Sequence, residues 1–448
     1  MKKTFLSAIS GQGLLGSILQ TLSTSVLIQV INISTGIITA HTLAPHGRGE
    51  LAAVMMWPQF LAYTLTFGVP VSLLYCIRRE PERRAELLGA ALLIGCMSGL
   101  LSIIVGIFGI PIWLRDYPPA IIGFAKLMIF AAPLSSISIL LPIAAQADQK
   151  FSLFNKFRIM PGLLTVSFLA ALYYFHHITV YTVAVAYLFA SFPTIIWSAI
   201  WVANNIHPNL RNLLPSARTL ISYGVRAWGG DLVGTISDQI DRVLVVAMLL
   251  PEDMGFYVVA LSSARIFAII PSALSNVLFP KLVSLGPTRG AALFLPVCFL
   301  VLFFMSLVAS PMIFGASFLL KLVYGTSFLP ATRVFQVLVV EAIFGGATWM
   351  LAQGFSAFGR PGRSSLQQIV GLACAVPLLL ILVPRFGLSG AGWAILGSTL
   401  IRFSFAIVNY VILFGVNIRV AAQAVKDLVS ARRNVVRDGA KDCSTGTI

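Results

Sequence analysis

The chain has 448 residues, of which 58% are hydrophobic and 10% are charged, and its mean hydropathy is +0.91. This composition excludes a soluble globular protein, and continuous apolar runs of about 20 residues exclude the short alternating segments of an outer-membrane barrel. The formal net charge of +16 does not indicate nucleic-acid binding, because the basic residues gather in alternate loops between the apolar runs.

Twelve apolar runs, separated by glycine, proline or charged residues, predict transmembrane helices joined by short loops. In chain order the predicted helices cover residues 14–40, 51–77, 87–112, 121–145, 158–175, 181–204, 221–248, 255–280, 291–316, 332–356, 365–384 and 390–416. The basic start of the chain is not followed by a short apolar core and a small-residue cleavage site, so we expect a retained first helix. The sequence therefore predicts an all-α polytopic membrane protein with twelve transmembrane helices.

The Lys and Arg residues of the loops fall mostly on one side of the predicted membrane. The loops of the other side hold only Arg48, Arg115, Lys321 and Arg385. Loops that are rich in Lys and Arg stay in the cytoplasm. The bias therefore predicts that both termini are cytoplasmic, which agrees with an even number of helices.

The second half of the chain repeats features of the first half at a nearly constant offset. Three pairs of segments align in order: TLAPHGRGELAAV from Thr42 with MLLPEDMGFYVVA from Met248, AQADQKF from Ala145 with AQGFSAF from Ala352, and HITVYTVAVA from His177 with RFGLSGAGWA from Arg385. Their offsets are 206, 207 and 208 residues, and the first pair aligns Pro45 with Pro251 and Gly49 with Gly255. An offset of six helices gives both halves the same orientation, as in transporters whose substrate site lies between parallel repeats.

This repeat predicts how the chain is divided. Residues 1–204 are expected to form an N-terminal six-helix bundle and residues 221–416 a C-terminal one, around a central cleft. Residues 205–220 are expected to be a cytoplasmic linker at the membrane interface, because they combine two prolines with an amphipathic pattern. Residues 417–448 are a basic cytoplasmic tail, which is expected either to lie as a helix on the anionic inner leaflet or to be solvated and partly disordered.

The predicted seventh helix carries several charges in an otherwise apolar run. They are Arg226, Asp231, Asp238, Asp241 and Arg242. A charge near the middle of a bilayer costs about 2.5–3.5 kcal/mol, so these side chains should face protein or water. Asp231, Asp238 and Arg242 share one helix face at about 100° per residue. The helix therefore either lines a transport cavity or is held to its neighbours by buried ion pairs.

Other charged side chains lie within or at the edges of the remaining predicted helices. Those singled out are Lys126, Arg265, Arg333, Glu341 and Arg402. A rise of about 1.5 Å per residue places Arg265 and Arg402 roughly 15–18 Å deep, and Glu341, about nine residues into its helix, at a similar depth. Ionisable side chains at this depth are candidates for a substrate or ion pathway.

The sequence lacks the motifs of several enzyme classes. No GxxxxGK[ST] sequence occurs, so the chain has no P-loop for ATP hydrolysis. The predicted outer loops of about 5–15 residues leave no room for the folded catalytic loop of a membrane glycosyltransferase. The five cysteines form no CxxC pair, and we expect no metal site. We therefore expect a protein that is not an enzyme, has no cofactor, and takes any energy from a gradient or from substrate flow.

Four segments carry a resemblance to a known family. They are TLAPHGRGELAAV after the first helix, the run from Asp238 to Leu282, AQGFSAFGRPGRSS after the tenth helix and LSGAGWAILGST at the start of the twelfth. Their spaced Gly, Pro, Asp and Arg residues resemble the polysaccharide exporters of the multidrug/oligosaccharidyl-lipid/polysaccharide (MOP) superfamily, and within it the Wzx-type O-antigen flippases. The resemblance implies two six-helix bundles in a V around a central cleft.

The resemblance also implies a function. A protein of this family would move an undecaprenyl-pyrophosphate-linked oligosaccharide from the inner to the outer leaflet of the bacterial inner membrane, with membrane lipid and polysaccharide polymerases as further partners. An ion-coupled multidrug or metabolite antiporter is the alternative, although an acidic cavity would suit cationic drugs better than the cationic helices found here. A membrane glycosyltransferase is the third hypothesis.

For a flippase, the pyrophosphate needs cations inside the cleft, and arginine matches phosphate oxygens with paired hydrogen bonds. We expect Arg265 and Arg402 to bind it, unless they only balance the charge of membrane carboxylates. Arg226 near the inner end would serve entry, and Lys126 and Arg333 near the outer rim would serve release.

Energy coupling is predicted to depend on the membrane carboxylates. Glu341 is expected to carry a coupling proton or sodium ion, because burial can raise the pKa of a carboxyl group; a purely structural Glu341 is the alternative. Asp231, Asp238, Asp241 and Arg242 are expected to take part in coupling or in ion pairs that line the cavity.

Overall fold

The computed structural model describes residues 14–272, 274–275, 282 and 287–415, and every regular element in this part of the chain is a helix. The α-helices are α2 (Leu14–Thr64), α3 (Val69–Arg79), α4 (Arg84–Trp113), α5 (Pro119–Met128), α6 (Ala132–Ala147), α7 (Phe151–Tyr174), α8 (Val180–Asn205), α9 (Leu213–Met248), α10 (Pro251–Ala264), α12 (Pro287–Phe314), α13 (Ala316–Tyr324), α14 (Thr332–Ala357) and α15 (Pro361–Phe414). Short 3-10 turns are η1 (Pro81–Arg83), η2 (Ile129–Ala131), η3 (Arg265–Ala268) and η4 (Thr326–Ala331). The predicted tail, residues 417–448, lies outside the described residues.

The two longest helices are each bent into two limbs. In α2 the bend is at Ala44, with φ 55° and ψ 178°, directly before Pro45. A residue before proline is pushed out of the helical region, and proline has no N–H to continue the hydrogen-bond ladder. In α15 the bend is at Gly387, with φ 54°, a conformation that glycine adopts without strain. Both bends fall between pairs of helices that the sequence predicts as separate.

Within the described residues, nine helices are long and apolar enough to cross a membrane. Two of them, spanning 42 and 53 residues, contain the bends of α2 and α15. Each is at least twice as long as the roughly 20 residues that one crossing requires. The protein is therefore an all-α polytopic membrane protein, while the count of twelve crossings remains a prediction.

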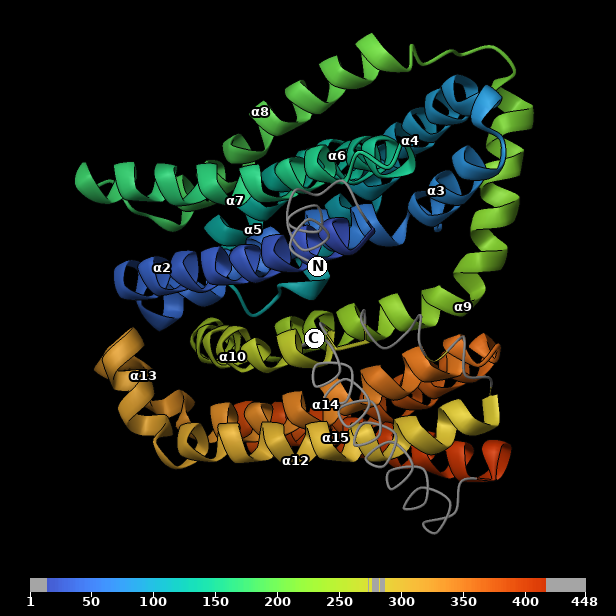
Figure 1. Ribbon diagram of the computed structural model, residues 1–448. Coiled ribbons are helices and arrows are strands. Elements are labelled where there is room, and N and C mark those ends of the chain that lie inside the picture. Colours follow the sequence, from blue (N-terminus) through green and yellow to red (C-terminus); the bar gives the residue numbers. More distant parts are fainter. Residues whose placement is uncertain (1–13, 273, 276–281, 283–286, 416–448) are drawn as a thin grey trace, which may run out of the picture.

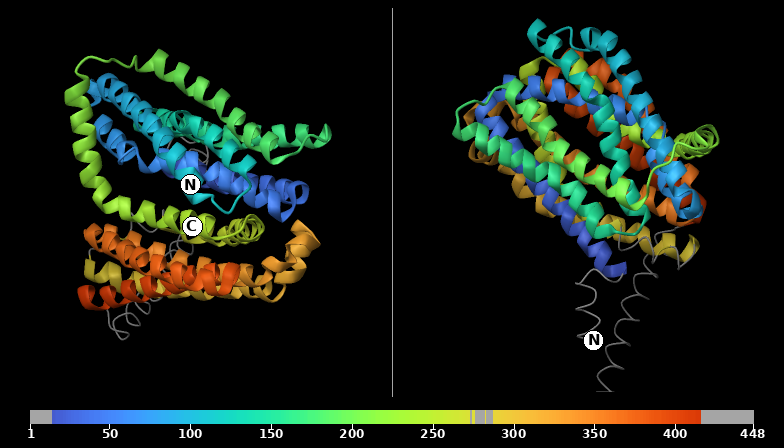
Figure 2. Two further views of the ribbon diagram at one scale, coloured as in Figure 1. Left: turned by 180° about the vertical axis from the view of Figure 1, so that it is seen from behind. Right: turned by 90° about the horizontal axis from the view of Figure 1, so that it is seen from above.

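The helices form two groups that lie one above the other in Figure 1. Helices α2 to α8 make up one group and α10 to α15 the other (Figures 1 and 2). Helix α9 first runs along one end of the molecule and then turns inward toward α10, and it contacts both groups. The groups meet chiefly along α2 and α10. We call the end with Pro45, Pro251 and α13 the proline end, and the opposite end, with Arg83 and Arg84, the basic end.

The two groups touch closely at the proline end. An added Cβ on Gly49 would overlap the carbonyl oxygen of Pro251, and one on Gly255 would overlap the carbonyl oxygen of Pro45. These residues are the two aligned pairs of the sequence repeat, so each half presents the same proline and glycine to the other. His41 Nε2 also lies 2.8 Å from the carbonyl oxygen of Val323 in α13. The proline end is therefore closed by backbone-to-backbone packing.

Helix α9 begins earlier than the sequence predicts, at Leu213 instead of residue 221. A proline is tolerated in the first helical turn, so Pro215 does not delay the start. The first turns of α9 pack against α3 and α4: the Tyr223 ring stacks on Tyr75 with centroids 4.1 Å apart, and Leu220 is fully buried. Much of the predicted interfacial linker is thus a helix packed on the N-terminal group.

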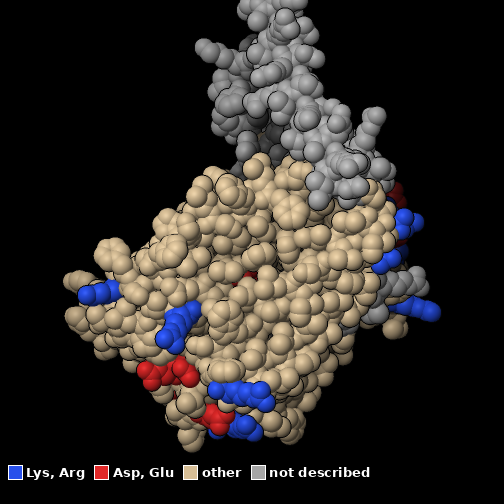
Figure 3. Space-filling view, turned by 90° about the horizontal axis from the view of Figure 1, so that it is seen from below, with Lys and Arg blue, Asp and Glu red and all other residues tan. Residues whose placement is uncertain are grey.

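The outer face of the C-terminal group is almost free of charge. Figure 3 shows a broad central area without Lys or Arg, whose side chains gather at the margins. On this side α12 exposes Phe299, Leu300, Phe303 and Leu307. A wide apolar surface bounded by charges is what a bilayer-facing helix requires.

Candidate functional site

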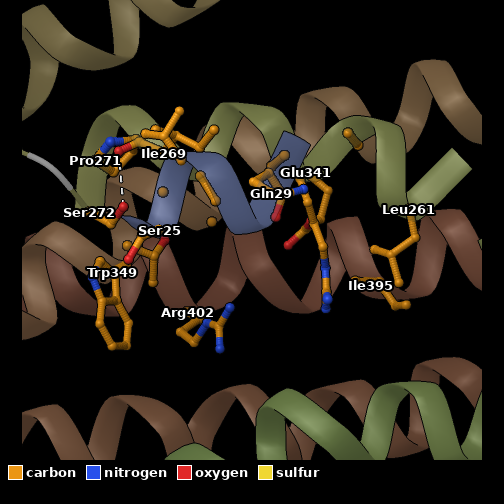
Figure 4. A pocket seen from close by; sticks show the side chains of 18 of the residues that line it. Ser25, Gln29, Leu261, Ile269, Pro271, Ser272, Glu341, Trp349, Ile395 and Arg402 are labelled. Atoms are coloured by element: carbon orange, nitrogen blue, oxygen red, sulfur yellow. Dashed lines mark hydrogen bonds between the residues drawn. The ribbon is translucent and has the colours of Figure 1, made fainter. Parts of the chain in front are cut away.

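A pocket of about 520 Å³ lies where the two groups of helices face each other. Its walls come from the first limb of α2 on one side and from α10, η3, α14 and α15 on the other (Figure 4). The α2 wall is formed by Ser25, Val26 and Gln29. Ser25 and Gln29 are one helical turn apart, so both face the same way. The pocket is thus built from both halves of the repeat, as a site between parallel repeats requires.

Arg402 enters the pocket from the second limb of α15. Its Nη1 donates a hydrogen bond of 2.8 Å to Oε1 of Gln368 on the first limb. Gly371 lies against the stem, since a Cβ there would be 2.8 Å from Cδ of Arg402. The Nε atom is buried and has no hydrogen-bond partner within the described structure. One edge of the guanidinium is therefore fixed by Gln368, while other N–H groups are available to a ligand.

Glu341 lines the same pocket from α14. Thr399 Oγ1 donates a hydrogen bond of 2.9 Å to its Oε1, and Thr399 is itself 1% exposed. Thr399 lies three residues before Arg402 on the same helix face. One turn of α15 therefore holds both the arginine and the hydroxyl that binds the carboxylate.

Arg265 reaches the pocket from the point where α10 ends and η3 begins. Its side chain is exposed, in contrast to its neighbours Ala264 and Phe267, which are buried. Arg265, Glu341 and Arg402 thus share one pocket. From the sequence alone the two arginines could face one cavity, and in the structure both line this pocket; their roles remain predictions.

Other residues proposed from the sequence lie elsewhere. Lys126, in the last turn of α5, and Arg333, in the first turn of α14, are not among the described residues that line the pocket. The backbone of α9 passes through Arg226, Asp231, Asp238, Asp241 and Arg242. The side chains of these five residues lie outside the described part of the structure, so their predicted roles stay predictions.

A second cavity of about 320 Å³ lies inside the N-terminal group. Its walls come from both limbs of α2 and from α5, η2, α6, α7 and α8. Its lining includes uncharged polar side chains and one charged one, Arg158. The sequence assigns Arg158 to an inner helix end, but α7 begins at Phe151, so Arg158 lies about 10 Å along the helix at 1.5 Å per residue.

The two cavities occupy equivalent places in the repeat. Six pairs of lining residues are related by the offsets 206, 207 and 208: Met55 and Leu261, Pro58 and Ala264, Gln59 and Arg265, Ser135 and Ala342, Pro161 and Gln368, and Tyr187 and Ile395. These are the offsets of the three aligned sequence segments. The repeat is therefore visible as two cavities with corresponding walls.

Several pocket residues are missed by sequence reasoning. Gln29 and Gln368 are amides inside apolar runs, and a search of the predicted helices for amides as well as charges finds both. Trp349 of the lining and Thr399, which binds Glu341 from outside the lining, carry no such signal, because hydroxyl and aromatic residues are common throughout these helices. They can be assigned only once α14 and α15 are placed side by side.

Comparisons with known proteins agree with this architecture. Residues 38–333 match the polysaccharide biosynthesis protein family. A Shigella flexneri protein that carries the provisional name O-antigen transporter is 22% identical over 281 residues. That match covers 60% of this chain and 66% of the relative, which is just under two thirds of its length.

Solved structures with very different sequences share the fold. The lipid II flippase MurJ in an inward closed conformation has a TM-score of 0.72 at 11% identity, covering 93% of both chains. An inward-facing multidrug resistance MATE family transporter of the MOP superfamily has a TM-score of 0.67 at 14% identity, covering 90% of this chain and 98% of its own. A point mutant of the Vibrio cholerae MATE transporter VcmN has a TM-score of 0.62 at 16% identity, covering 92% and 99%. The chain therefore belongs to the polysaccharide biosynthesis protein family and has the fold of MOP-superfamily flippases and transporters.

Proposed function

We propose that this protein is a flippase that moves a polyprenyl-pyrophosphate-linked oligosaccharide across the bacterial inner membrane by alternating access. The observation that carries the proposal is the pairing of Arg265 and Arg402 in one pocket between the halves. The family and the fold support transport over glycosyl transfer. The specific lipid-linked substrate, the inner membrane location, the cytoplasmic termini and a polymerase partner are all parts of this proposal.

The electrostatics of the pocket suit a pyrophosphate. Its two or more negative charges must leave water, and in a poorly screened site each nearby cation has a large effect. Arg402 has a buried Nε–H without a partner in the described structure, and Arg265 has an exposed side chain at the pocket wall. Arginine binds phosphate oxygens through two parallel hydrogen bonds, which also fixes the orientation of the group.

Glu341 supplies the coupling step in this proposal. A proton or sodium ion on Glu341 neutralises its carboxylate. The net charge of the pocket then becomes more positive, because the charges of Arg265 and Arg402 are no longer offset by Glu341. That state favours the anionic substrate. Thr399 holds the carboxylate through its hydroxyl group, so it also belongs to the coupling group. Binding of the ion and of the pyrophosphate would therefore be linked.

The packing at the proline end suits an alternating-access cycle. The loop charges predict that this end faces outward, and here Gly49 and Gly255 bring the two halves into backbone contact. The lipid-linked glycan would enter from the basic end and leave after this contact opens. The positive charges of the basic end would attract the substrate on the cytoplasmic side.

Antiport of an organic cation is the second candidate. Glu341 and the indole ring of Trp349 line the same pocket, and a carboxylate with an aromatic face can hold a cation. The two arginines oppose this function by repelling the cation. Measured transport of an organic cation by the protein would therefore be needed to favour antiport.

Reconstitution tests the two functions directly. Proteoliposomes containing the full chain receive either a fluorescent undecaprenyl-pyrophosphate-linked disaccharide or ethidium, with and without a proton or sodium gradient. We expect the lipid-linked sugar to reach the opposite leaflet and ethidium to stay in place. Ethidium movement driven by the gradient, without movement of the lipid-linked sugar, would replace the flippase proposal with antiport.

A further inference from the structure

We propose that the second cavity, in the N-terminal half, binds an acidic sugar residue of the transported glycan and that Arg158 pairs with its carboxylate. The inference rests on the proposed flippase function and extends it, because it assigns the glycan a place separate from the pyrophosphate. Three features carry it: the lining of the cavity, the surroundings of Arg158 and the position of α2 between the two cavities.

The lining of the second cavity is suited to a sugar. Its volume of about 320 Å³ is at the lower end of ordinary small-ligand pockets, so it holds a small group such as one sugar residue. The hydroxyls of Thr35, Ser135, Thr165 and Ser191 donate to carbonyl oxygens of their own helices. Their lone pairs remain as acceptors for sugar hydroxyl groups.

Two amides supply further hydrogen-bonding groups. Asn32 and Gln59 line the cavity and are exposed, and their side-chain amides make no hydrogen bond to other described residues. An amide offers both a hydrogen-bond donor and an acceptor, and sugar hydroxyl groups need both kinds of partner. Tyr187 adds an aromatic wall to the same cavity. Together these residues recognise hydroxyl groups without requiring a charge.

Arg158 adds a single charge to this neutral lining. No aspartate or glutamate lines the cavity, and within the described structure no carboxylate lies within ion-pair distance of Arg158. Its recorded contacts are a 3.5 Å hydrogen bond from Nη2 to Ser25 Oγ and a face contact with Phe154 at 5.5 Å. A guanidinium inside a membrane span, with no counter-ion among the described residues, favours an anionic ligand.

The equivalent positions of the two cavities explain why this anion is not a second pyrophosphate. Gln59 occupies the place that Arg265 has in the other half, so the N-terminal cavity lacks that arginine. Arg158 contacts Ser25, which lines the pyrophosphate pocket. The second cavity therefore lies next to the first across α2. A glycan attached to a pyrophosphate in the first pocket can reach it.

A matched pair of substrates tests the inference. Two undecaprenyl-pyrophosphate-linked disaccharides, identical except for glucuronate or glucose as the second sugar, carry a fluorophore that dithionite destroys after translocation. Reconstituted wild-type protein is expected to move the glucuronate substrate about 10-fold faster, because only this substrate can form a charge-assisted pair with Arg158. Arg158→Gln should slow only this substrate, and Arg158→Lys should restore part of the preference. Arg115→Gln, on an exposed loop, is the matched control.

The outcomes separate the proposed acidic-sugar site from the proposed flippase function. Equal wild-type rates for both substrates overturn the inference, and so does an Arg158→Gln variant that slows both equally, because Arg158 would then serve the pyrophosphate or the fold. If neither substrate moves, the flippase proposal fails. In that case the affinity of detergent-purified protein for the two lipids still decides the inference: an Arg158-dependent preference for glucuronate supports it, and equal affinity rejects it.

Discussion

The two cavities of this protein have corresponding walls but different charges. The C-terminal pocket has Arg265 where the N-terminal cavity has Gln59, and its Glu341 and Arg402 align with Leu134 and Thr194, which do not line the N-terminal cavity. The one charged residue in the lining of the N-terminal cavity is Arg158. The fold fixes where a cavity forms, because both halves bend and pack in the same way. The side chains at a few positions then decide which part of a ligand each cavity can take.

Removing the charges of the C-terminal pocket is expected to have the largest effect on transport. The double variant Arg265→Ala/Arg402→Ala is expected to reduce transport of a pyrophosphate-linked glycan by 100-fold or more, since each lost charge-assisted bond costs roughly 1.5–3 kcal/mol. Arg402→Lys should retain part of the activity, because lysine keeps the charge but loses the paired geometry. Normal transport by the double variant at wild-type protein levels would remove the proposed pyrophosphate site.

Exchanging an arginine between the two cavities tests whether their equivalent positions are interchangeable. In the double variant Gln59→Arg/Arg265→Gln the arginine moves to the equivalent position of the other cavity. We expect transport to stay reduced by about 30-fold, as for Arg265→Gln alone, because the exchanged arginine no longer shares a pocket with Arg402. The flipping assay in proteoliposomes compares the double variant with both single variants. Full rescue by the exchange would mean that the two cavities are interchangeable.

A third variant disturbs the contact between the two halves at the proline end. Gly49→Ala places a methyl group against the carbonyl oxygen of Pro251, so the proline end cannot close as it does here. We expect about a 10-fold loss of transport from a clash costing roughly 1–3 kcal/mol, together with greater labelling of cysteines introduced at this end. Gly123→Ala is the control, since no atom lies within 4 Å of an added Cβ there. Unchanged labelling in Gly49→Ala would show that this contact is not a gate.

The smallest effect is expected at the coupling carboxylate. Glu341→Gln keeps the shape of the side chain and its bond from Thr399, but it removes the charge that a proton or sodium ion neutralises. Transport should fall by several fold and lose its dependence on the ion gradient, while binding of the anionic lipid in detergent is kept or improved. A variant that still responds to the gradient like the wild type would restrict Glu341 to a structural role.

The sequence predicts the depth of the pocket arginines better than their partners. Arg265 and Arg402 can be placed by counting residues from the helix ends, because the rise of a helix is constant. Gln368 and Thr399 cannot be paired with Arg402 and Glu341 in this way. Those contacts depend on the bend at Gly387, which sets how the two limbs of α15 lie against each other and against α14.

Errors in helix boundaries have the largest consequences for function. The predicted membrane helix of residues 158–175 begins at Arg158, which places this residue at a helix end. In the structure Asn155 is buried and donates a hydrogen bond to Thr21 Oγ1, so α7 extends through it. A buried polar contact between distant helices cannot be read from one sequence. Arg158, three residues farther along α7, lines the N-terminal cavity.

The first limb of α2 is a partition shared by both cavities. Ser25 and Gln29 face the pocket between the halves, while Asn32 and Thr35 face the cavity inside the N-terminal half. Because the two sets of side chains share one helix, a rotation or shift of this limb would change the volumes of both cavities together. The limb ends at Ala44, beside the contact that closes the proline end. The same helix limb therefore connects both cavities to the proline end, so ligand binding in either cavity would be coupled to opening of that end through the bend before Pro45.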